Sequence, residues 1–251
     1  MRVTDMPDFP VTLAVYNFLP VMLTGVALWY LARYVESQDA ANHPLALAGG
    51  ALILAGGLAK AVWKLIAAVS GIDLVWLSNA LFPLMAPGFA LLAAALWGAT
   101  RRRHDRPSGV QGGLVRPRVL WSAALVVIGL AFTAAALRQW VFATPRGWFL
   151  PLLLLASLSN LAVSVLLIGA SLRLRRWSVA ALFAVNLAMI FALQPIAMAT
   201  PKTLALHWLE QSLTALGTGC FALAAFLLNR IARGGGRRLS SATPVAGHAS
   251  D

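Results

Sequence analysis

Long apolar stretches separated by short polar connections make up most of the chain. Seven of them reach the roughly 20 residues that cross a bilayer as a helix. They cover residues 10–33, 46–69, 73–99, 119–140, 148–172, 178–199 and 204–229. The pattern predicts an all-α, polytopic membrane protein with seven transmembrane helices in one domain, residues 1–233. Residues 234–251 show no hydrophobic period, and we expect a disordered cytoplasmic tail there.

Composition supports this fold class. Of the 251 residues, 60% are hydrophobic and 11% are charged, whereas soluble domains are about 45–50% apolar and about 25% charged. The net charge of +12 does not indicate a nucleic-acid-binding protein, because the arginines lie in short connections between apolar stretches. The single cysteine, Cys220, excludes an intramolecular disulfide. Richness in Ala, Leu and Arg is typical of a multi-pass protein of a bacterial inner membrane, which is the localisation we expect.

The distribution of basic residues predicts the orientation of the helices. With the N-terminus outside, the inner segments hold fourteen Lys and Arg residues and the outer segments hold four. Cytoplasmic segments of membrane proteins carry the excess of positive charge. The sequence therefore predicts an N-out, C-in topology, with the two remaining basic residues, Lys60 and Lys64, inside the second span.

The third and seventh spans resemble each other weakly. Without gaps, Trp76 aligns with Trp208 and Phe89 with Phe221. Spans 1–3 and 5–7 have the same orientation, so such a relation predicts a parallel 3+1+3 repeat with the fourth span as connector. A chance match between two helices rich in Leu and Ala is the alternative.

The two lysines are the most informative polar residues. Lys60 and Lys64 are four residues apart, so they share one face of a helix. An ionisable side chain within a membrane costs roughly 2.5–3.5 kcal/mol on insertion scales. Glu210, the one carboxylate well inside a predicted span, lies at a depth similar to that of Lys64 below the outer surface. An ion pair would relieve both costs if the two helices are neighbours.

One carboxylate against two ammonium groups leaves a surplus positive charge. Either one amine is neutral, or an anion completes the site. The second alternative predicts a cavity in the outer half of the bundle that binds a small anionic or zwitterionic ligand. Lys60 and Lys64 would hold the negative charge, and Glu210 would be a counter-ion or proton acceptor. Polar residues on other spans are the candidates for orienting the ligand: Asn17, Asn79, Gln194 and Gln211, with His207 on the Glu210 face.

Structural explanations exist for each of these residues. Lysines near a helix end extend their amines toward the lipid headgroups. Asn160, Ser164 and Asn186 are expected to form hydrogen bonds between helices. His207 and Glu210 fit residues at the membrane interface equally well.

The sequence leaves the function open between three classes. Small-solute transport or ligand sensing is the expectation, and a sensor would need a partner protein at the basic loop 100–118. The alternatives are an interfacial lipid-modifying enzyme that uses His207 and Glu210, and a structural or assembly subunit of a membrane complex. No catalytic residue is identified, since no nucleophile is evident. No metal or cofactor is expected, because Cys220 lies more than two turns deeper than Glu210. The oligomeric state is not predicted.

Overall fold

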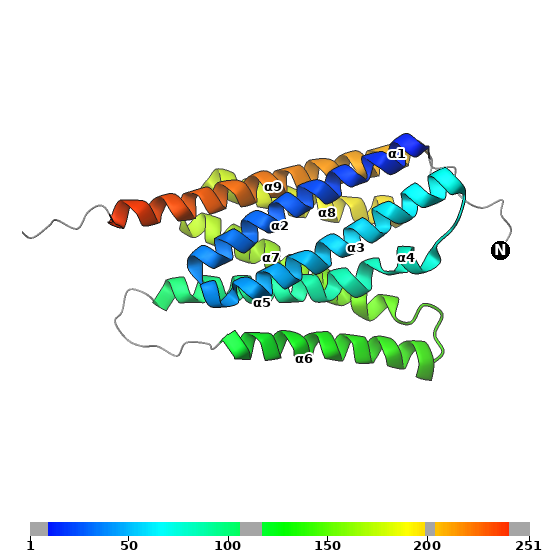
Figure 1. Cartoon of the computed structure of the whole chain (residues 1–251), viewed down its shortest axis with the longest axis horizontal. Coiled ribbons are helices and arrows are strands. Elements are labelled where there is room, and N and C mark those ends of the chain that lie inside the picture. The colour runs from blue at the N-terminus through cyan, green and yellow to red at the C-terminus, as the bar shows by residue number, and fades with distance from the viewer. Residues whose placement is uncertain (1–9, 106–116, 199–203, 241–251) are drawn as a thin grey trace, which may run out of the picture.

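The computed structural model describes residues 10–105, 117–198 and 204–240, and this part of the chain is helical throughout apart from short turns. The long helices lie side by side along one axis, as Figure 1 shows. In chain order they are α1 (Val11–Tyr16), α2 (Phe18–Gln38), the short η2 (Ala40–Asn42), α3 (His43–Ser70), α4 (Val75–Asn79), α5 (Leu81–Asp105), α6 (Pro117–Ala136), the π-helical η3 (Leu137–Val141), α7 (Phe149–Arg173), α8 (Trp177–Met198) and α9 (Leu204–Ser240).

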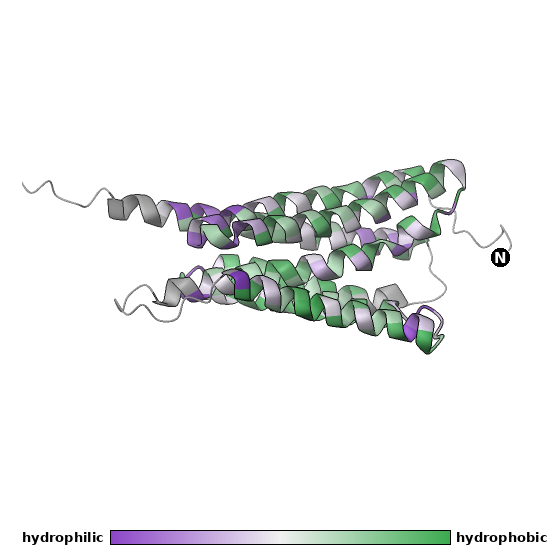
Figure 2. Ribbon diagram, turned by 60° about the horizontal axis from the view of Figure 1, so that its bottom comes forward, coloured by the Kyte–Doolittle hydropathy of each residue, from purple (hydrophilic) through white to green (hydrophobic). Residues whose placement is uncertain are grey.

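The predicted all-α membrane fold is confirmed. Among the described residues, six helical segments are long and apolar enough to cross a bilayer, and Trp177–Leu193 of α8 is a shorter apolar one. Figure 2 shows apolar residues along the middle of the helices and polar residues gathered toward their ends. Helix α9 continues to Ser240, into the stretch expected to be a tail, and residues 241–251 lie outside the described part.

The first and third spans are each interrupted near their predicted outer ends. The breaks fall at Asn17, between α1 and α2, and at Ala80, between α4 and α5. Each break comes three residues before a proline, Pro20 or Pro83. A proline has no N–H for the carbonyl four residues earlier, and its ring clashes with that carbonyl. The prolines thus interrupt both helices where the site described below begins.

Six spans form a closed ring, and the fourth packs outside it. Around the ring, α2 contacts α3, α3 contacts α5, α5 contacts α7, α7 contacts α8, α8 contacts α9, and α9 contacts α2. Helix α6 packs on α5 and α7 alone among the long helices and lies along one edge of the bundle (Figure 1). This order is the one that a parallel 3+1+3 repeat requires, with α6 as the connector. The repeat itself stays a prediction.

Helices α3 and α5 approach each other closely through glycines. A Cβ atom on Gly49 would lie 2.7 Å from the carbonyl oxygen of Gly88, and one on Gly88 would lie 2.8 Å from that of Gly49. Two turns further along α3, a Cβ on Gly56 would lie 2.9 Å from the carbonyl oxygen of Leu81. Small residues permit this approach, as in other membrane helix pairs. The contact holds the lysine-bearing half of α3 in place.

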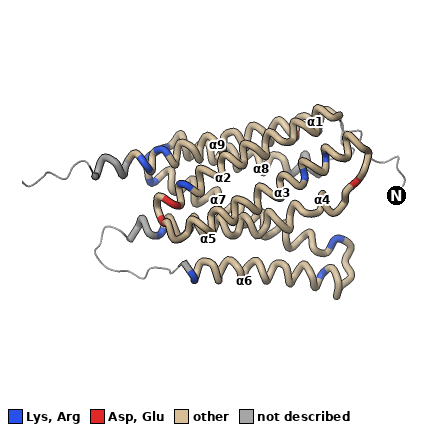
Figure 3. Tube along the Cα trace, in the orientation of Figure 1, with Lys and Arg blue, Asp and Glu red and all other residues tan. Residues whose placement is uncertain are grey.

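The half of the bundle that we expect to face the cytoplasm is a dense apolar core. Its large fully buried side chains come from all six ring helices: Leu31, Leu45, Leu92, Leu96, Leu167, Phe183 and Leu228. Most of the described Lys and Arg residues gather beyond this core, at the same end of the bundle, as Figure 3 shows. The cavity described below lies in the other half, which we call the outer half.

Candidate functional site

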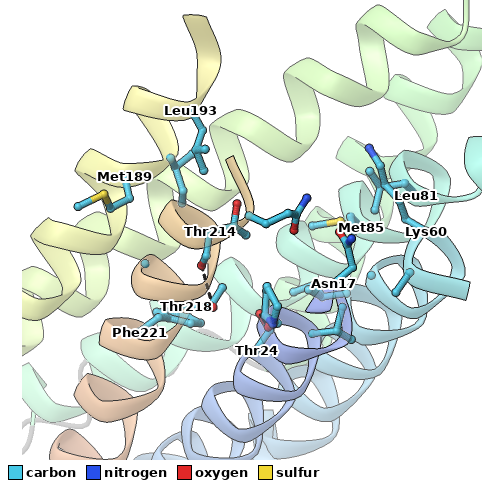
Figure 4. Close-up of a pocket in the computed structure, with 18 of the residues that line it drawn as sticks. Asn17, Thr24, Lys60, Leu81, Met85, Met189, Leu193, Thr214, Thr218 and Phe221 are labelled. Carbon is cyan, nitrogen blue, oxygen red and sulfur yellow. Dashed lines mark hydrogen bonds between the residues drawn. The ribbon is translucent and has the colours of Figure 1, made fainter. Parts of the chain in front are cut away.

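A cavity of about 400 Å³ lies inside the ring, in the outer half of the bundle. Every ring helix contributes to its wall, together with Asn17 at the α1–α2 break. Figure 4 shows side chains from these helices converging on one space. Small-molecule sites are typically cavities of this size, with a mostly apolar wall and a few polar groups.

Asn17, Lys60, Lys64 and Glu210 form what we call the rim of the cavity. Asn17, Lys64 and Glu210 each lie about six residues from the outer end of their span, which is roughly 9 Å at 1.5 Å per residue. Lys60 lies one helical turn deeper. Both lysines line the cavity.

Asn17 links the rim to the interrupted helix. Lys64 Nζ donates a hydrogen bond to Asn17 Oδ1 at 2.9 Å, and Asn17 Nδ2 donates one to the Leu13 carbonyl at 2.7 Å. The Asn17 side-chain nitrogen is thus bonded to α1, and its side-chain oxygen accepts from the Lys64 amine. Lys64 is half-buried, whereas Lys60 is exposed. The predicted pairing of a lysine with Glu210 stays a prediction.

The ionisable side chains of the wall are few. Among the described residues that line the cavity, only Lys60, Lys64 and Glu210 carry an ionisable group. A lysine ammonium group donates hydrogen bonds and accepts none, so the two lysines offer donors for an anionic group of a ligand.

Three threonines line the middle of the cavity, and their hydroxyl protons are already used. Thr24 donates to the Pro20 carbonyl at 2.8 Å, Thr214 to the Glu210 carbonyl at 2.7 Å, and Thr218 to the Thr214 carbonyl at 2.8 Å. Figure 4 shows Thr214 and Thr218 one turn apart on α9, with Thr24 across from them on α2. A hydroxyl has one donor and two acceptor lone pairs, so these oxygens present acceptors to the cavity.

Two buried amides face the cavity without a partner. Asn186 is 7% exposed and Gln211 is 6% exposed, and both line the wall. Within the described part of the chain, neither side chain forms a hydrogen bond. The two amides therefore present their hydrogen-bonding groups to the cavity.

The deep end of the cavity is apolar. Leu28, Ile53, Phe89 and Phe221 are the innermost wall residues of α2, α3, α5 and α9, and we call them the floor. The ring of Phe221 packs edge-on against that of Phe183 in the core, with centroids 5.9 Å apart. The floor therefore passes directly into the apolar core, which closes the cavity on the inner side.

Sequence reasoning named five residues that the structure brings together, two that it places elsewhere and one whose side chain is not described. Asn17, Lys60, Lys64, Glu210 and Gln211 line the cavity. Asn79 is exposed at the end of α4, His207 is not part of the wall, and the side chain of Gln194 lies outside the described residues.

Asn160 and Asn186 were expected to join helices, yet they line the cavity, and within the described part neither forms a hydrogen bond. The threonine layer was missed as a binding element, although Thr214, Thr218 and Phe221 share one face of α9 at helical spacing.

No protein-family model, no curated protein and no solved structure matches this chain. The function is therefore argued from the cavity itself.

Proposed function

We propose that this multi-pass membrane protein binds a small anionic or zwitterionic solute in the outer-half cavity, as the binding step of solute transport or of ligand sensing. The observation that carries the proposal is the pair of buried, unpartnered amides of Asn186 and Gln211 beside the cationic rim. A bound solute would supply the missing partners.

A purely structural polar layer would look different. Amides that hold helices together donate and accept across the helix interface, whereas Asn186 and Gln211 face open space of about 400 Å³. The proposal of a structural or assembly subunit therefore has less support.

The enzyme alternative uses His207 together with Glu210, and of these two residues only Glu210 lines the cavity. His207 does not line the cavity. Its neighbour Trp208 packs against Tyr16 with ring centroids 5.7 Å apart, which joins α9 to α1 beside His207. A lateral entrance for a lipid at this residue is therefore not favoured.

Native mass spectrometry of the purified protein tests the proposal, because it detects a bound solute of any identity by its mass. The wild type is compared with a Lys60→Met/Lys64→Met double variant, in which the length of both side chains is roughly kept and their charge removed. We expect the wild type to retain a small acidic molecule and the double variant to lose most of it. Equal adducts on both proteins, or none on either, would contradict the proposal.

Two further variants serve as controls. Lys60→Arg/Lys64→Arg keeps the charge and should keep the adduct. Arg101→Met removes a positive charge from the exposed inner end of α5, next to Trp97, and should not change it. Reconstitution into vesicles then separates the two roles: the retained molecule accumulates inside if the protein transports it and only binds if the protein is a sensor.

A further inference from the structure

The six ring helices divide into two groups by how extensively they pack. Helix α3 packs most on α5, which packs on α7, and α2 packs most on α9, which packs on α8. We call α3, α5 and α7 unit A, and α2, α8 and α9 unit B. The units meet mainly along two seams, α2–α3 and α7–α8, where the packing is less extensive. The cavity lies between the units, because both of them contribute to its wall.

Glycines of α3 show the same difference between its two neighbours. A Cβ atom on Gly49 would lie 2.7 Å from the backbone of α5, at the Gly88 carbonyl oxygen. On the adjacent Gly50, which faces α2, a Cβ would have the Leu28 side chain as its nearest contact, at 3.4 Å. The backbones of α3 and α5 therefore lie directly against each other, while side chains separate α3 from α2. Unit A is the tighter assembly, and the α2–α3 seam is the looser contact.

The chain passes between the units twice, and both passages are short turns at the inner end of the bundle. Residues 39–42 join α2 to α3, and residues 174–176 join α7 to α8. The first turn lies at the end of the bundle opposite α1, as Figure 1 shows. Asn42 Nδ2 donates to Asp39 Oδ2 at 2.6 Å, and the Asn42 side chain packs against Gly98 of α5. The units are thus tied at the inner end, where the apolar core also joins all six ring helices.

In the outer half, unit A has a core of its own. Leu152 and Leu155 of α7 form a second buried cluster with Ala86 of α5 and Ala135 of α6. The buried members of this cluster all come from α5, α6 and α7. The outer half of unit A is therefore held together by its own contacts and does not depend on unit B.

Helix α1 bridges the outer end of the α2–α3 seam. It contacts α3, and Asn17 at its end accepts a hydrogen bond from Lys64 of α3 at 2.9 Å. On the side of unit B, Tyr16 packs against Trp208 of α9 with ring centroids 5.7 Å apart. The break between α1 and α2, three residues before Pro20, interrupts the helix and allows α1 to change its angle to α2.

We infer that units A and B separate and close at their outer ends about the two inner turns, and that α1 is the clasp that holds the closed form through the Asn17–Lys64 hydrogen bond. Hinge motions of this kind enclose ligands between two rigid parts in other proteins. A solute enters the cavity from the outer side in the open form and is enclosed in the closed form, while the inner core stays shut. This inference rests on the proposed function and specifies how its site is reached.

Pulsed electron paramagnetic resonance tests the motion on the full chain in nanodiscs of phosphatidylcholine. In a Cys220→Ala background, cysteines that replace exposed residues carry spin labels in pairs, and the distribution of distances within each pair is measured. The pairs are Ser70 and Ala205 across the units at the outer end, Arg101 and Arg230 across them at the inner end, and Ser70 and Leu150 within unit A.

Two single variants remove the clasp from opposite sides. Asn17→Ala removes the acceptor of the hydrogen bond, and Lys64→Met removes its donor. Each should raise the ratio of long to short distances in the outer pair about tenfold, since a hydrogen bond from a lysine is lost, and the double variant should raise it no further. The other two pairs should keep their distances. Ser122→Ala is the control, because the Ser122 hydroxyl donates to the Val119 carbonyl within α6.

The distances decide the inference without any ligand. It is wrong if the outer pair keeps its wild-type ratio in both single variants, or if the inner pair lengthens together with the outer pair. An equal change within unit A would also contradict it, since unit A would then not move as one body. The proposed function is tested separately by the lysine-dependent adduct in mass spectrometry, so the failure of one is distinguishable from the failure of the other.

Discussion

At the scale of single residues, some buried amides face the cavity and others form hydrogen bonds within the fold. Asn186 and Gln211 are buried without a partner in the described part of the chain, while Asn42, at 0% exposure, donates to Asp39 Oδ2 at 2.6 Å. The same kind of side chain thus serves binding in one place and structure in another. Sequence alone could not separate these roles, because Asn42 and Asn186 are both asparagines in or beside apolar helices.

This contrast makes a prediction for stability. Asn186→Leu removes an unsatisfied amide, so the free energy of unfolding should stay the same or rise by up to about 1 kcal/mol. Asn42→Leu removes the hydrogen bond that the buried Asn42 amide donates to Asp39 Oδ2 and should lower it by about 1–3 kcal/mol. Thermal unfolding in one detergent compares the two. A large loss of stability in Asn186→Leu would show that this residue joins helices, as the sequence pattern predicts.

At the scale of elements, the sequence predicted where the helices lie along the chain but not which helices pack against each other. Hydrophobic length placed each span to within several residues, and the prolines at positions 20 and 83 account for the breaks at Asn17 and Ala80. The partner of each helix depends on the fit of two surfaces, which no period along one helix reveals. The glycines of α3 permit close contact with another helix, but they do not identify α5 as that helix.

The glycine contact between α3 and α5 should be sensitive to a single methyl group. Gly88→Ala would place a Cβ atom 2.8 Å from the Gly49 carbonyl oxygen and 2.9 Å from the Ile53 nitrogen, both in the backbone of α3. Overpacking of this kind typically costs about 1–3 kcal/mol. Gly169→Ala on α7 is the matched control, because nothing lies within 4 Å of its new Cβ. Its helix should be unchanged or stabilised by up to about 1 kcal/mol. Equal melting temperatures for the two variants would contradict the close packing.

At the scale of the whole molecule, charge and cavity divide the bundle into two halves. Most of the described arginines gather beyond the apolar core at one end, and the cavity lies toward the other (Figure 3). Charge counting predicted this orientation from the sequence. The ring of six spans, with α6 outside, could not be predicted because it depends on all helix contacts together.

Thiol labelling in intact cells tests the orientation. In a Cys220→Ala background, cysteines replace exposed residues between the long helices. These are Ile72 and Ala143 at one end and Ala41 and Arg175 at the other. We expect a membrane-impermeant maleimide to label the first pair from outside and the second pair only after the membrane is opened. The reverse pattern would place the cavity in the cytoplasmic half and would exclude an outward-facing binding site.

The central claim is a water-accessible cavity whose rim is positively charged, and one labelling experiment addresses it directly. Thr214→Cys in the Cys220→Ala background is reacted from outside with an anionic and with a cationic methanethiosulfonate, and Ile72→Cys gives the reference rates. We predict that the anionic reagent is favoured at position 214 by about tenfold relative to position 72, and that Lys60→Met/Lys64→Met removes this preference. No reaction at position 214, or the same ratio of rates at both positions, would contradict the claim.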